Sequence, residues 1–493
     1  MTLRKQGRRR MPGWGRRLAI VAWFPAFLVS ACGAPPPEPG PVFESGLGPA
    51  VALPGAEVPR WTLEERMGHY EVPGVSVAVI DGGRIVLAKG YGLADTEAGT
   101  PVTASTLFQA ASISKPVAAM GALTLVEEGR LSLDEPVNAV LSGWQVPENE
   151  FTRDSVVTLR GILTHTAGLT VWGFPGYARG VEVPSVLEVL QGVPPANTDA
   201  VRVWKVPGTG FRYSGGGYTV MQKAVEDVAG RPFAEYLGEQ VLSPAGMAES
   251  TYEQPLPGDR WPQAARGHRG GAIEVEGEWH TYPEMAAAGL WTTPSDLARL
   301  AIEVQRSLKG ESNRVLSVAM TEAFLNPEPH NGWGLGFEID GEGDERVFAH
   351  DGSNAGYKSL LVAYARQGQG AAVMTNGDGG APLAAEIVRA VAAAYDWPTR
   401  RTEVRDTVTL TPVELASFVG TYEVPEAGWE VRVTVRDNRL RARSGNNPTA
   451  TLYPFSPTRF FRLEDGVWVD FEMGDDGRAR ALVLAEEIRA ERR

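Results

Sequence analysis

Apolar and polar positions along the body of the chain follow strand and helix periods in turn. A mostly apolar run, Gly74–Ile80, is followed by an Asp-Gly-Gly turn and a second run, Arg84–Lys89, which together predict a β-hairpin. A helical pattern covers Pro116–Glu128. Because proline is tolerated only in the first turn of a helix, this pattern places the start of the helix close to Ser112.

The pattern continues with helices and then with strands. Leu163–Leu169 predicts a helix that ends at a glycine cap, and Thr293 is typical of a residue that caps a helix over Leu297–Leu308. Strands at both ends of the body with helices between them predict an α+β fold: one antiparallel sheet flanked by helices, plus an α-rich lobe. The later elements are expected at Trp333–Phe337, Tyr357–Tyr364 and Ala371–Thr375, all strands, and at Ala384–Tyr395, a closing helix.

The pattern changes after Pro398, where short runs are separated by Gly, Asp-Asn and Asn-Asn. This spacing is typical of a small all-β domain, and we expect a barrel-like domain over residues 398–493. The expected strands are Phe418–Tyr422, Trp429–Val435, Arg439–Arg443, Ala450–Tyr453, Arg459–Arg462 and Val467–Glu472.

Residues 1–31 have the pattern of an export signal peptide. Seven Arg and Lys residues precede the apolar stretch Leu18–Val29, which is short for a bilayer span. The sequence Val29-Ser30-Ala31-Cys32 resembles a bacterial lipobox, in which the cysteine is acylated after cleavage. We therefore expect export to the cell envelope and a lipid anchor on Cys32. An uncleaved membrane anchor and a plain secretory peptide are the alternatives.

The segment that follows the leader has the composition of a linker. Residues 32–59 are expected to form an extended tether, because Gly33–Pro59 holds eight prolines and almost no periodic pattern.

The charge of the chain limits the kinds of partner that it could bind. The net charge is −13, and removing the seven leader cations leaves −20. This acidity argues against binding to nucleic acid and against nonspecific electrostatic binding to anionic lipid. The histidines are scattered without ligand spacing, so the sequence predicts no metal and no cofactor.

Three short motifs carry the candidate chemistry. They are Ser112-Ile113-Ser114-Lys115, Tyr213-Ser214-Gly215 and His350-Asp351-Gly352. Together they resemble the active-site motifs of the serine β-lactamase and penicillin-binding-protein superfamily: Ser-x-x-Lys, Tyr-x-Asn, and Lys-Thr-Gly or its His-x-Gly variant. The longer segment His350–Gly356 resembles the His-x-Gly-x-x-x-Gly form of this motif in class C-like members. The resemblance implies a hydrolase domain over residues 60–397, and the C-terminal domain resembles the β-barrel often appended to such enzymes.

The motif residues suit nucleophilic catalysis. Lys115 lies one helical turn after Ser112, so both side chains emerge on one face. A serine hydroxyl needs a proton acceptor as it attacks. Lys115 could accept the proton if burial lowered its pKa, or it could stay charged and lower the pKa of the Tyr213 phenol. The sequence leaves both possibilities open, and we treat the three side chains as one coupled unit.

Acylation also needs two N–H donors for the oxyanion. The backbone N–H of Ser112 is one, because it lies at a helix N-terminus. The resemblance implies that the N–H of Ser353 is the other, on an edge strand that follows His350. Gly352 is expected to let substrate approach this strand closely.

Substrate contacts are expected beside the motifs, at Gly215, Tyr218 and Asn354. The tyrosine motif ends in Gly215 where the family has asparagine, so a hydrogen-bonding side chain is absent and the substrate class is in question. The loop Thr170–Thr198, which carries several aromatic residues, is a candidate wall of the cleft. His165 has no nucleophile at a useful spacing, and we interpret it as structural.

The sequence therefore predicts a serine hydrolase that forms an acyl-enzyme on Ser112 and acts on a small ester, amide or peptide. His350, with an ordinary pKa near 6.5, is largely neutral where relatives carry a fixed cation, which favours short acyl esters over β-lactams. One alternative is a D-Ala-D-Ala carboxypeptidase, D-aminopeptidase or weak β-lactamase acting on cell-wall-type substrates. Another is a non-catalytic wall-peptide-binding protein, in which Ser112 is a helix cap and Tyr213 a packed aromatic residue.

Overall fold

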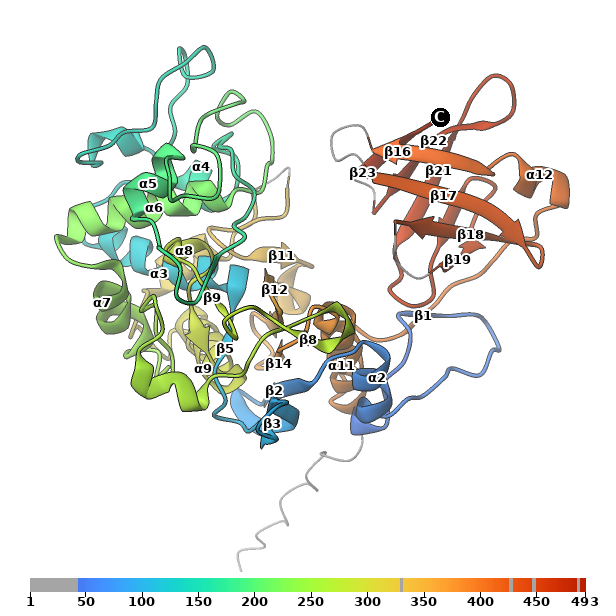
Figure 1. Cartoon of the computed structure of the whole chain (residues 1–493), viewed down its shortest axis with the longest axis horizontal. Helices are drawn as coiled ribbons and strands as arrows, with labels where there is room; N and C mark the ends of the chain where they lie inside the picture. The colour runs from blue at the N-terminus through green and yellow to red at the C-terminus, as the bar shows by residue number, and fades with distance from the viewer. Residues whose placement is uncertain (1–42, 329–330, 425–428, 446–448, 486–487) are drawn as a thin grey trace, which may run out of the picture. The chain divides into compact units, whose positions relative to one another are not determined.

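The computed structural model describes residues 43–328, 331–424, 429–445, 449–485 and 488–493 (Figure 1). Its largest sheet has seven strands in the order β11-β12-β13-β14-β2-β3-β4, and each neighbouring pair is antiparallel. The leader and Cys32 lie outside the described residues. The strands of the sheet are β2 Gly74–Asp81, β3 Arg84–Asp95, β4 Thr100–Pro101, β11 Glu338–Asp340, β12 Val347–Asn354, β13 Tyr357–Tyr364 and β14 Gly370–Thr375.

Helices bury both faces of this sheet, which explains why β2 is apolar almost throughout. Val75 and Val79 point to one face and pack with α11, Gly380–Ala394. Ala78 and Ile80 point to the other face, which α9, Pro294–Leu308, covers. The remaining helices are α2 Leu63–His69, α3 Ser114–Glu127, α4 Leu159–Leu163, α5 Val186–Gln191, α6 Gly215–Ala229, α7 Phe233–Leu237, α8 Met285–Ala288, α10 Val318–Phe324 and α12 Pro412–Ala416.

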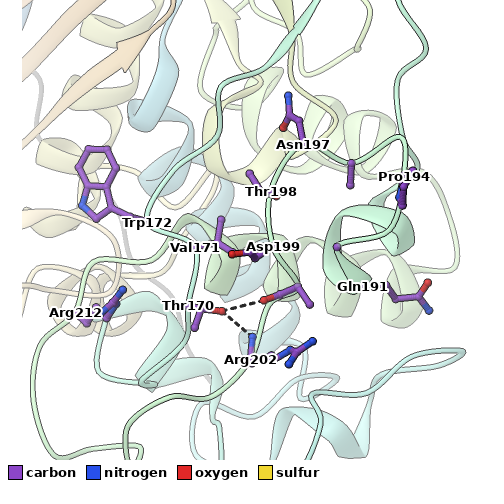
Figure 2. A pocket seen from close by; sticks show the side chains of 13 residues that line it. Thr170, Val171, Trp172, Gln191, Pro194, Asn197, Thr198, Asp199, Arg202 and Arg212 are labelled. Carbon is purple, nitrogen blue, oxygen red and sulfur yellow. Dashed lines mark hydrogen bonds between the residues drawn. The ribbon is translucent and has the colours of Figure 1, made fainter. Parts of the chain in front are cut away.

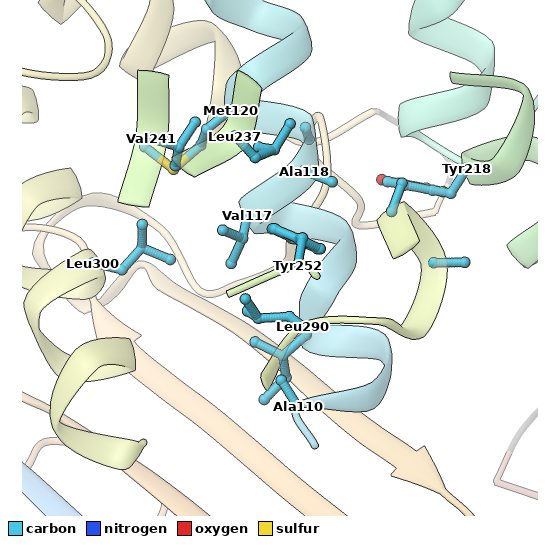
Figure 3. Close-up of a cluster of buried hydrophobic side chains, with 14 of the residues drawn as sticks. Ala110, Val117, Ala118, Met120, Tyr218, Leu237, Val241, Tyr252, Leu290 and Leu300 are labelled. Atoms are coloured by element: carbon cyan, nitrogen blue, oxygen red, sulfur yellow. The ribbon is translucent and has the colours of Figure 1, made fainter. Parts of the chain in front are cut away.

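Helix α3 runs through the middle of the larger core (Figure 3). Every residue from Ser114 to Leu125 is buried, as expected for a helix that is apolar on all sides. Figure 3 shows Leu237 and Tyr252 packed around it. Gly121 keeps this packing close, because a Cβ there would lie 2.7 Å from a methyl carbon of Leu237. The helix is therefore held rigidly on all sides, and so is the segment that leads into it.

The C-terminal region forms a closed antiparallel barrel in which consecutive strands pair and β16 pairs with β23. Its interior is a separate core that includes Tyr422, Leu440 and Phe471. The α+β body and the all-β barrel confirm the predicted fold class. The barrel strands are β16 Gly420–Val424, β17 Trp429–Arg436, β18 Arg439–Ser444, β19 Ala450–Pro454, β20 Arg459–Phe461, β21 Trp468–Met473, β22 Ala479–Leu484 and β23 Ile488–Arg492.

Several short two-stranded sheets connect loop segments. Among them, β5 pairs with β10 next to the start of α3, and β1 pairs in parallel with β15. No helix in the described parts of the chain is long and apolar enough to cross a membrane. These short strands are β1 Val51–Ala52, β5 Phe108–Gln109, β6 Tyr177–Ala178, β7 His268–Arg269, β8 Ile273–Glu274, β9 His280–Thr281, β10 Trp291–Thr292 and β15 Glu403–Val404.

Several sequence expectations are corrected. Trp333–Phe337 is a turn rather than a strand, because the Gly334 N–H bonds the Phe337 carbonyl and Gly336 has a φ of +141°. The helix expected over Leu163–Leu169 ends at Leu163. The predicted tether does not extend over its full length, since Phe43 and Leu47 are completely buried in the core with α11. Two apolar side chains among many prolines and glycines were enough to attach this segment.

Candidate active site

Ser112 lies in a 3₁₀ turn, Ala111–Ile113, that leads directly into α3. The preceding residue, Ala111, has a φ of +51°, which is strained for a residue with a Cβ. Surrounding bonds impose this conformation: the Ser114 hydroxyl donates to the Ala111 carbonyl at 2.5 Å, and the Leu290 N–H donates to that hydroxyl at 3.0 Å. The nucleophile therefore occupies a position that the packed core fixes.

Lys115 contacts the candidate nucleophile directly. Its Nζ donates to Ser112 Oγ at 3.0 Å and to the carbonyl of Ala287, the penultimate residue of α8, at 2.8 Å. The side chain is almost completely buried. Burial lowers the pKa of Lys115 to about 7, and the negative charge of Asp351 limits the fall. At neutral pH a large fraction of Lys115 is therefore neutral and able to accept a proton.

Tyr213 shows the opposite shift. Burial raises its pKa well above that of free tyrosine, while a hydrogen bond with Ser112 acts against the rise. Lys115 Nζ lies 4.9 Å from the centroid of its ring. The structure thus brings Ser112, Lys115 and Tyr213 together as the motifs predicted. It also separates their roles, because the phenol holds its proton at pH values where the lysine has released one.

His165 positions Tyr213. The two rings are stacked with centroids 4.3 Å apart, and His165 Nδ1 accepts the N–H of Ser214 at 3.1 Å. The imidazole is buried, and burial places its pKa well below that of free histidine. Since Nδ1 accepts a hydrogen bond, the ring is neutral with its proton on Nε2. His165 therefore has a structural role, as predicted: it packs against the Tyr213 ring and binds the backbone of the next residue.

The third motif lies on β12. Strand β11 pairs only with Val347–Ala349, so the portion of β12 from His350 onward forms an edge of the sheet. His350 is buried, its Nδ1 donates to the Asp351 carbonyl at 2.6 Å, and burial lowers its pKa to about 4. The imidazole is thus neutral at physiological pH. Ser353 is exposed on this edge, and its role as an oxyanion donor stays a prediction.

The motif residues open onto a cavity of about 540 Å³. Five of its fifteen described lining residues are aromatic, and the sequence had identified only part of the lining. Trp172 and Phe174 come from the predicted loop, whereas Phe211, Trp333 and Glu338 carried no sequence signal. The residues that line it are Ser112, Lys115, Trp172, Gly173, Phe174, Pro175, Phe211, Tyr213, Ala287, Ala288, Trp333, Glu338, Asp351, Ser353 and Asn354.

A larger and more open cavity of about 1140 Å³ shares Trp172 with the first (Figure 2). In Figure 2 the Trp172 indole lies apart from the side chains of Asp199 and Arg202. Within it the Thr170 hydroxyl links two backbone groups, the N–H of Arg202 and the carbonyl of Ala200. None of the three motifs contributes a lining residue. The smaller cavity is therefore the candidate active site despite its size.

Two other predicted site residues, Tyr218 and Asn354, make structural hydrogen bonds near the cavity. Tyr218 is fully buried and donates to the Leu163 carbonyl at 3.0 Å, so it does not line the cavity. The Asn354 amide reaches the cavity, but it donates to Gln109 at 2.8 Å and to the Ala288 carbonyl at 3.1 Å. It therefore connects β12 to β5 and α8.

Gly352 and Gly215 have packing roles that sequence reasoning had not identified. A Cβ at Gly352 would lie 2.2 Å from the Ala110 carbonyl, so this glycine lets β12 approach the Ser112 turn rather than the substrate. A Cβ at Gly215 would lie 2.9 Å from the Phe174 ring. The space that a side chain at position 215 would enter is thus occupied by an apolar ring.

The fold and the site define a serine hydrolase class, and comparison confirms it. Residues 60–396 match the Beta-lactamase family, so the chain belongs to this family. Residues 404–492 match a domain of unknown function, DUF3471. Among the described residues, no group of His, Cys, Asp and Glu side chains is arranged to hold a metal ion.

Individual relatives are similar at modest identity. Penicillin-binding protein 4* of Bacillus subtilis is 24% identical over 457 residues, which cover 86% of this chain and 96% of that protein. Esterase EstB of Burkholderia gladioli is 29% identical over 56% of this chain and 77% of the esterase. The octameric penicillin-binding protein homologue from Pyrococcus abyssi is 25% identical, with a TM-score of 0.59 over 87% of this chain and 98% of its own.

Proposed function

We propose that the protein hydrolyses acyl esters through an acyl-enzyme on Ser112, with short, uncharged acyl groups favoured over β-lactams. The observation that carries this proposal is the buried Lys115, whose Nζ lies 3.0 Å from Ser112 Oγ and whose pKa is lowered to about 7. A neutral amine at that distance is a competent general base.

The reaction follows from this geometry. Ser112 Oγ attacks the ester carbonyl and gives its proton to Lys115, while the N–H groups of Ser112 and Ser353 stabilise the oxyanion. The bond to the alcohol breaks, and the departing oxygen takes up a proton from the Lys115–Tyr213 pair. Water then attacks the acyl-enzyme and transfers a proton to the same pair. The bond between the acyl carbon and Ser112 Oγ breaks, the pair returns that proton to Ser112 Oγ, and the acid is released.

The cavity favours an apolar acyl group in two ways. The Phe174 ring occupies the space beside Gly215, where the family motif has a hydrogen-bonding asparagine. His350, in the place of the family lysine, is buried and neutral. Neither residue supplies the polar or cationic contact that a β-lactam or a wall peptide would use for its amide and carboxylate.

Comparison of kcat/KM on one preparation of the purified protein tests the proposal. The substrates are p-nitrophenyl butyrate, a penicillin and a peptide ending in D-Ala-D-Ala. We expect the ester to have the largest value and the penicillin a low one. A larger kcat/KM for the penicillin or for the peptide would contradict the proposal. Attachment through Cys32 remains a proposal from the sequence.

A further inference from the structure

The exposed charges that face the active-site cavity are all negative. Of the described lining residues, Asp351 and Glu338 are exposed carboxylates, and Lys115 is the one Lys, Arg or His residue. Lys115 is buried and engaged with Ser112 and Ala287, whereas Asp351 is exposed. No Lys, Arg or His nitrogen of the described chain lies within ion-pair distance of the Asp351 carboxylate.

Asp351 is also next to the reacting centre. It stands two residues before Ser353 on β12, and both side chains are exposed and line the cavity. Residues two apart on a strand share a face and are separated by roughly 7 Å. A group of the substrate that lies beside the scissile carbonyl is therefore within reach of this carboxylate.

The neighbouring walls suit a cation as well. Trp172, Tyr213 and Trp333 line the same cavity, and Tyr213 lies 5.7 Å from Trp172 and 5.8 Å from Trp333 between ring centroids. Aromatic faces attract ammonium groups through their quadrupoles. The cavity thus combines two exposed carboxylates, Asp351 and Glu338, with several aromatic rings, and the described residues place no exposed cation in it.

We propose that Asp351 determines specificity by charge, so that the enzyme prefers substrates with an ammonium group close to the scissile carbonyl over neutral substrates, and neutral over carboxylate-bearing ones. This inference rests on the proposed ester hydrolysis and adds the class of substituent that the site selects. It assigns a residue in the variable middle position of the third motif to substrate selection, while Ser112, Lys115 and Tyr213 carry out the reaction.

Substrates of similar size that differ in charge test the inference. On the alcohol side these are butyrylcholine, its neutral isostere 3,3-dimethylbutyl butyrate, and 4-(butanoyloxy)butanoate. On the acyl side they are the p-nitroanilides of alanine and of propionic acid. We expect the cationic member of at least one pair to have a kcat/KM roughly 5- to 30-fold above its neutral partner at low ionic strength, and the preference to shrink in 1 M salt.

Asp351→Asn should abolish that ratio, since the amide keeps the shape and removes the charge. Asp344→Asn is the matched control: this exposed aspartate follows β11 and does not line the cavity, so its removal should leave the ratio unchanged. The kcat/KM of the neutral ester serves as the reference for folding and for the basal reaction in each variant.

The outcomes separate the two proposals. If the neutral ester is hydrolysed but all cation-to-neutral ratios are close to one, or survive Asp351→Asn, the role of Asp351 is overturned and the ester hydrolase stands. If no ester is hydrolysed and Ser112 takes up no covalent label, the proposed function itself fails. A ratio that falls equally in Asp344→Asn would show a general charge effect and would also overturn the assignment.

Discussion

At the scale of single residues, burial favours one of the two proton acceptors that the sequence left open, Lys115 over Tyr213. The same desolvation acts on a cation and on a neutral phenol with opposite results, because it penalises whichever form carries charge. It lowers the pKa of Lys115 to about 7 and raises that of Tyr213. These shifts support the proposal that the lysine is the proton acceptor and that the phenol keeps its proton beside it.

This assignment predicts the pH dependence of the reaction. Neutral Lys115 is the active form, so kcat/KM for p-nitrophenyl butyrate should rise with pH through an apparent pKa of about 7. His350, with its pKa lowered to about 4, contributes no change in this range. A profile that is flat between pH 6 and 8, or that rises near pH 4, would contradict the assignment.

Glu284 provides the control for this profile. It is buried at the start of α8, and burial raises its pKa to about 8. Its ionisation could disturb the helix that presents the Ala287 carbonyl to Lys115. Glu284→Gln should leave the rise in kcat/KM near pH 7 unchanged. Any change in kcat/KM that this variant causes should be confined to higher pH.

Sequence patterns predicted the nucleophile, its lysine and the tyrosine, because their spacing and order are local properties. They did not predict Phe174 beside Gly215, Trp333 beside Tyr213 or the stack of His165 on Tyr213. Each of these contacts joins segments far apart in the chain. Which aromatic residue fills a given space depends on the three-dimensional path of loops that have no periodic pattern.

At the scale of elements, β12 and the turn before α3 are packed against each other. The Ser359 hydroxyl donates to the Ala110 carbonyl at 2.8 Å, and Gly352 allows the strand to lie against the same carbonyl. One contact region therefore sets the distance between the two predicted oxyanion donors, Ser112 and Ser353. We therefore expect the geometry of the predicted oxyanion site to depend on Gly352.

Gly352→Ala should damage this arrangement. The new Cβ would lie 2.2 Å from the Ala110 carbonyl oxygen and from Ser359 Oγ, so the strand must shift. We expect the free energy of unfolding to fall by about 1–3 kcal/mol and kcat/KM for p-nitrophenyl butyrate to fall at least tenfold. Urea denaturation and ester hydrolysis measure the two effects.

The matched control is Gly68→Ala, in helix α2, where a Cβ would meet nothing within 4 Å. This variant should be at least as stable as the parent, because alanine favours helix over glycine. Full activity and unchanged stability in Gly352→Ala would show that the strand does not set the oxyanion geometry.

Helices and strands with a strong hydrophobic periodicity were predicted close to their observed bounds, and segments without such a periodicity were not. Tyr357–Tyr364 and the helix capped by Thr293 lie where the pattern placed them. Trp333–Phe337 alternates large residues with glycine and so imitated a strand, although its glycines form a turn. Strands β22 and β23 were missed. Arg and Glu occupy three of the five positions of β23, whereas β22 is a mostly apolar run with one Arg.

At the scale of the whole molecule, the catalytic apparatus lies within one part of the chain. All residues that line the active-site cavity fall within the 60–396 range that matches the Beta-lactamase family. The barrel has its own core and contributes no lining residue among those described. The fold class, an α+β body followed by an all-β barrel, was accessible from the sequence because each part has a different period. The attachment of Phe43 was not, since one buried side chain leaves no pattern.

The central claim is that Ser112 forms the acyl-enzyme, and mapping a covalent adduct tests it most directly. The protein is labelled with a fluorophosphonate, digested and analysed by tandem mass spectrometry that resolves Ser112 from Ser114, whose buried hydroxyl is occupied by Ala111 and Leu290. We predict a single adduct on Ser112, and its loss in Ser112→Ala with an unchanged circular dichroism spectrum. An adduct on another serine, or labelling that persists in Ser112→Ala, would contradict the account.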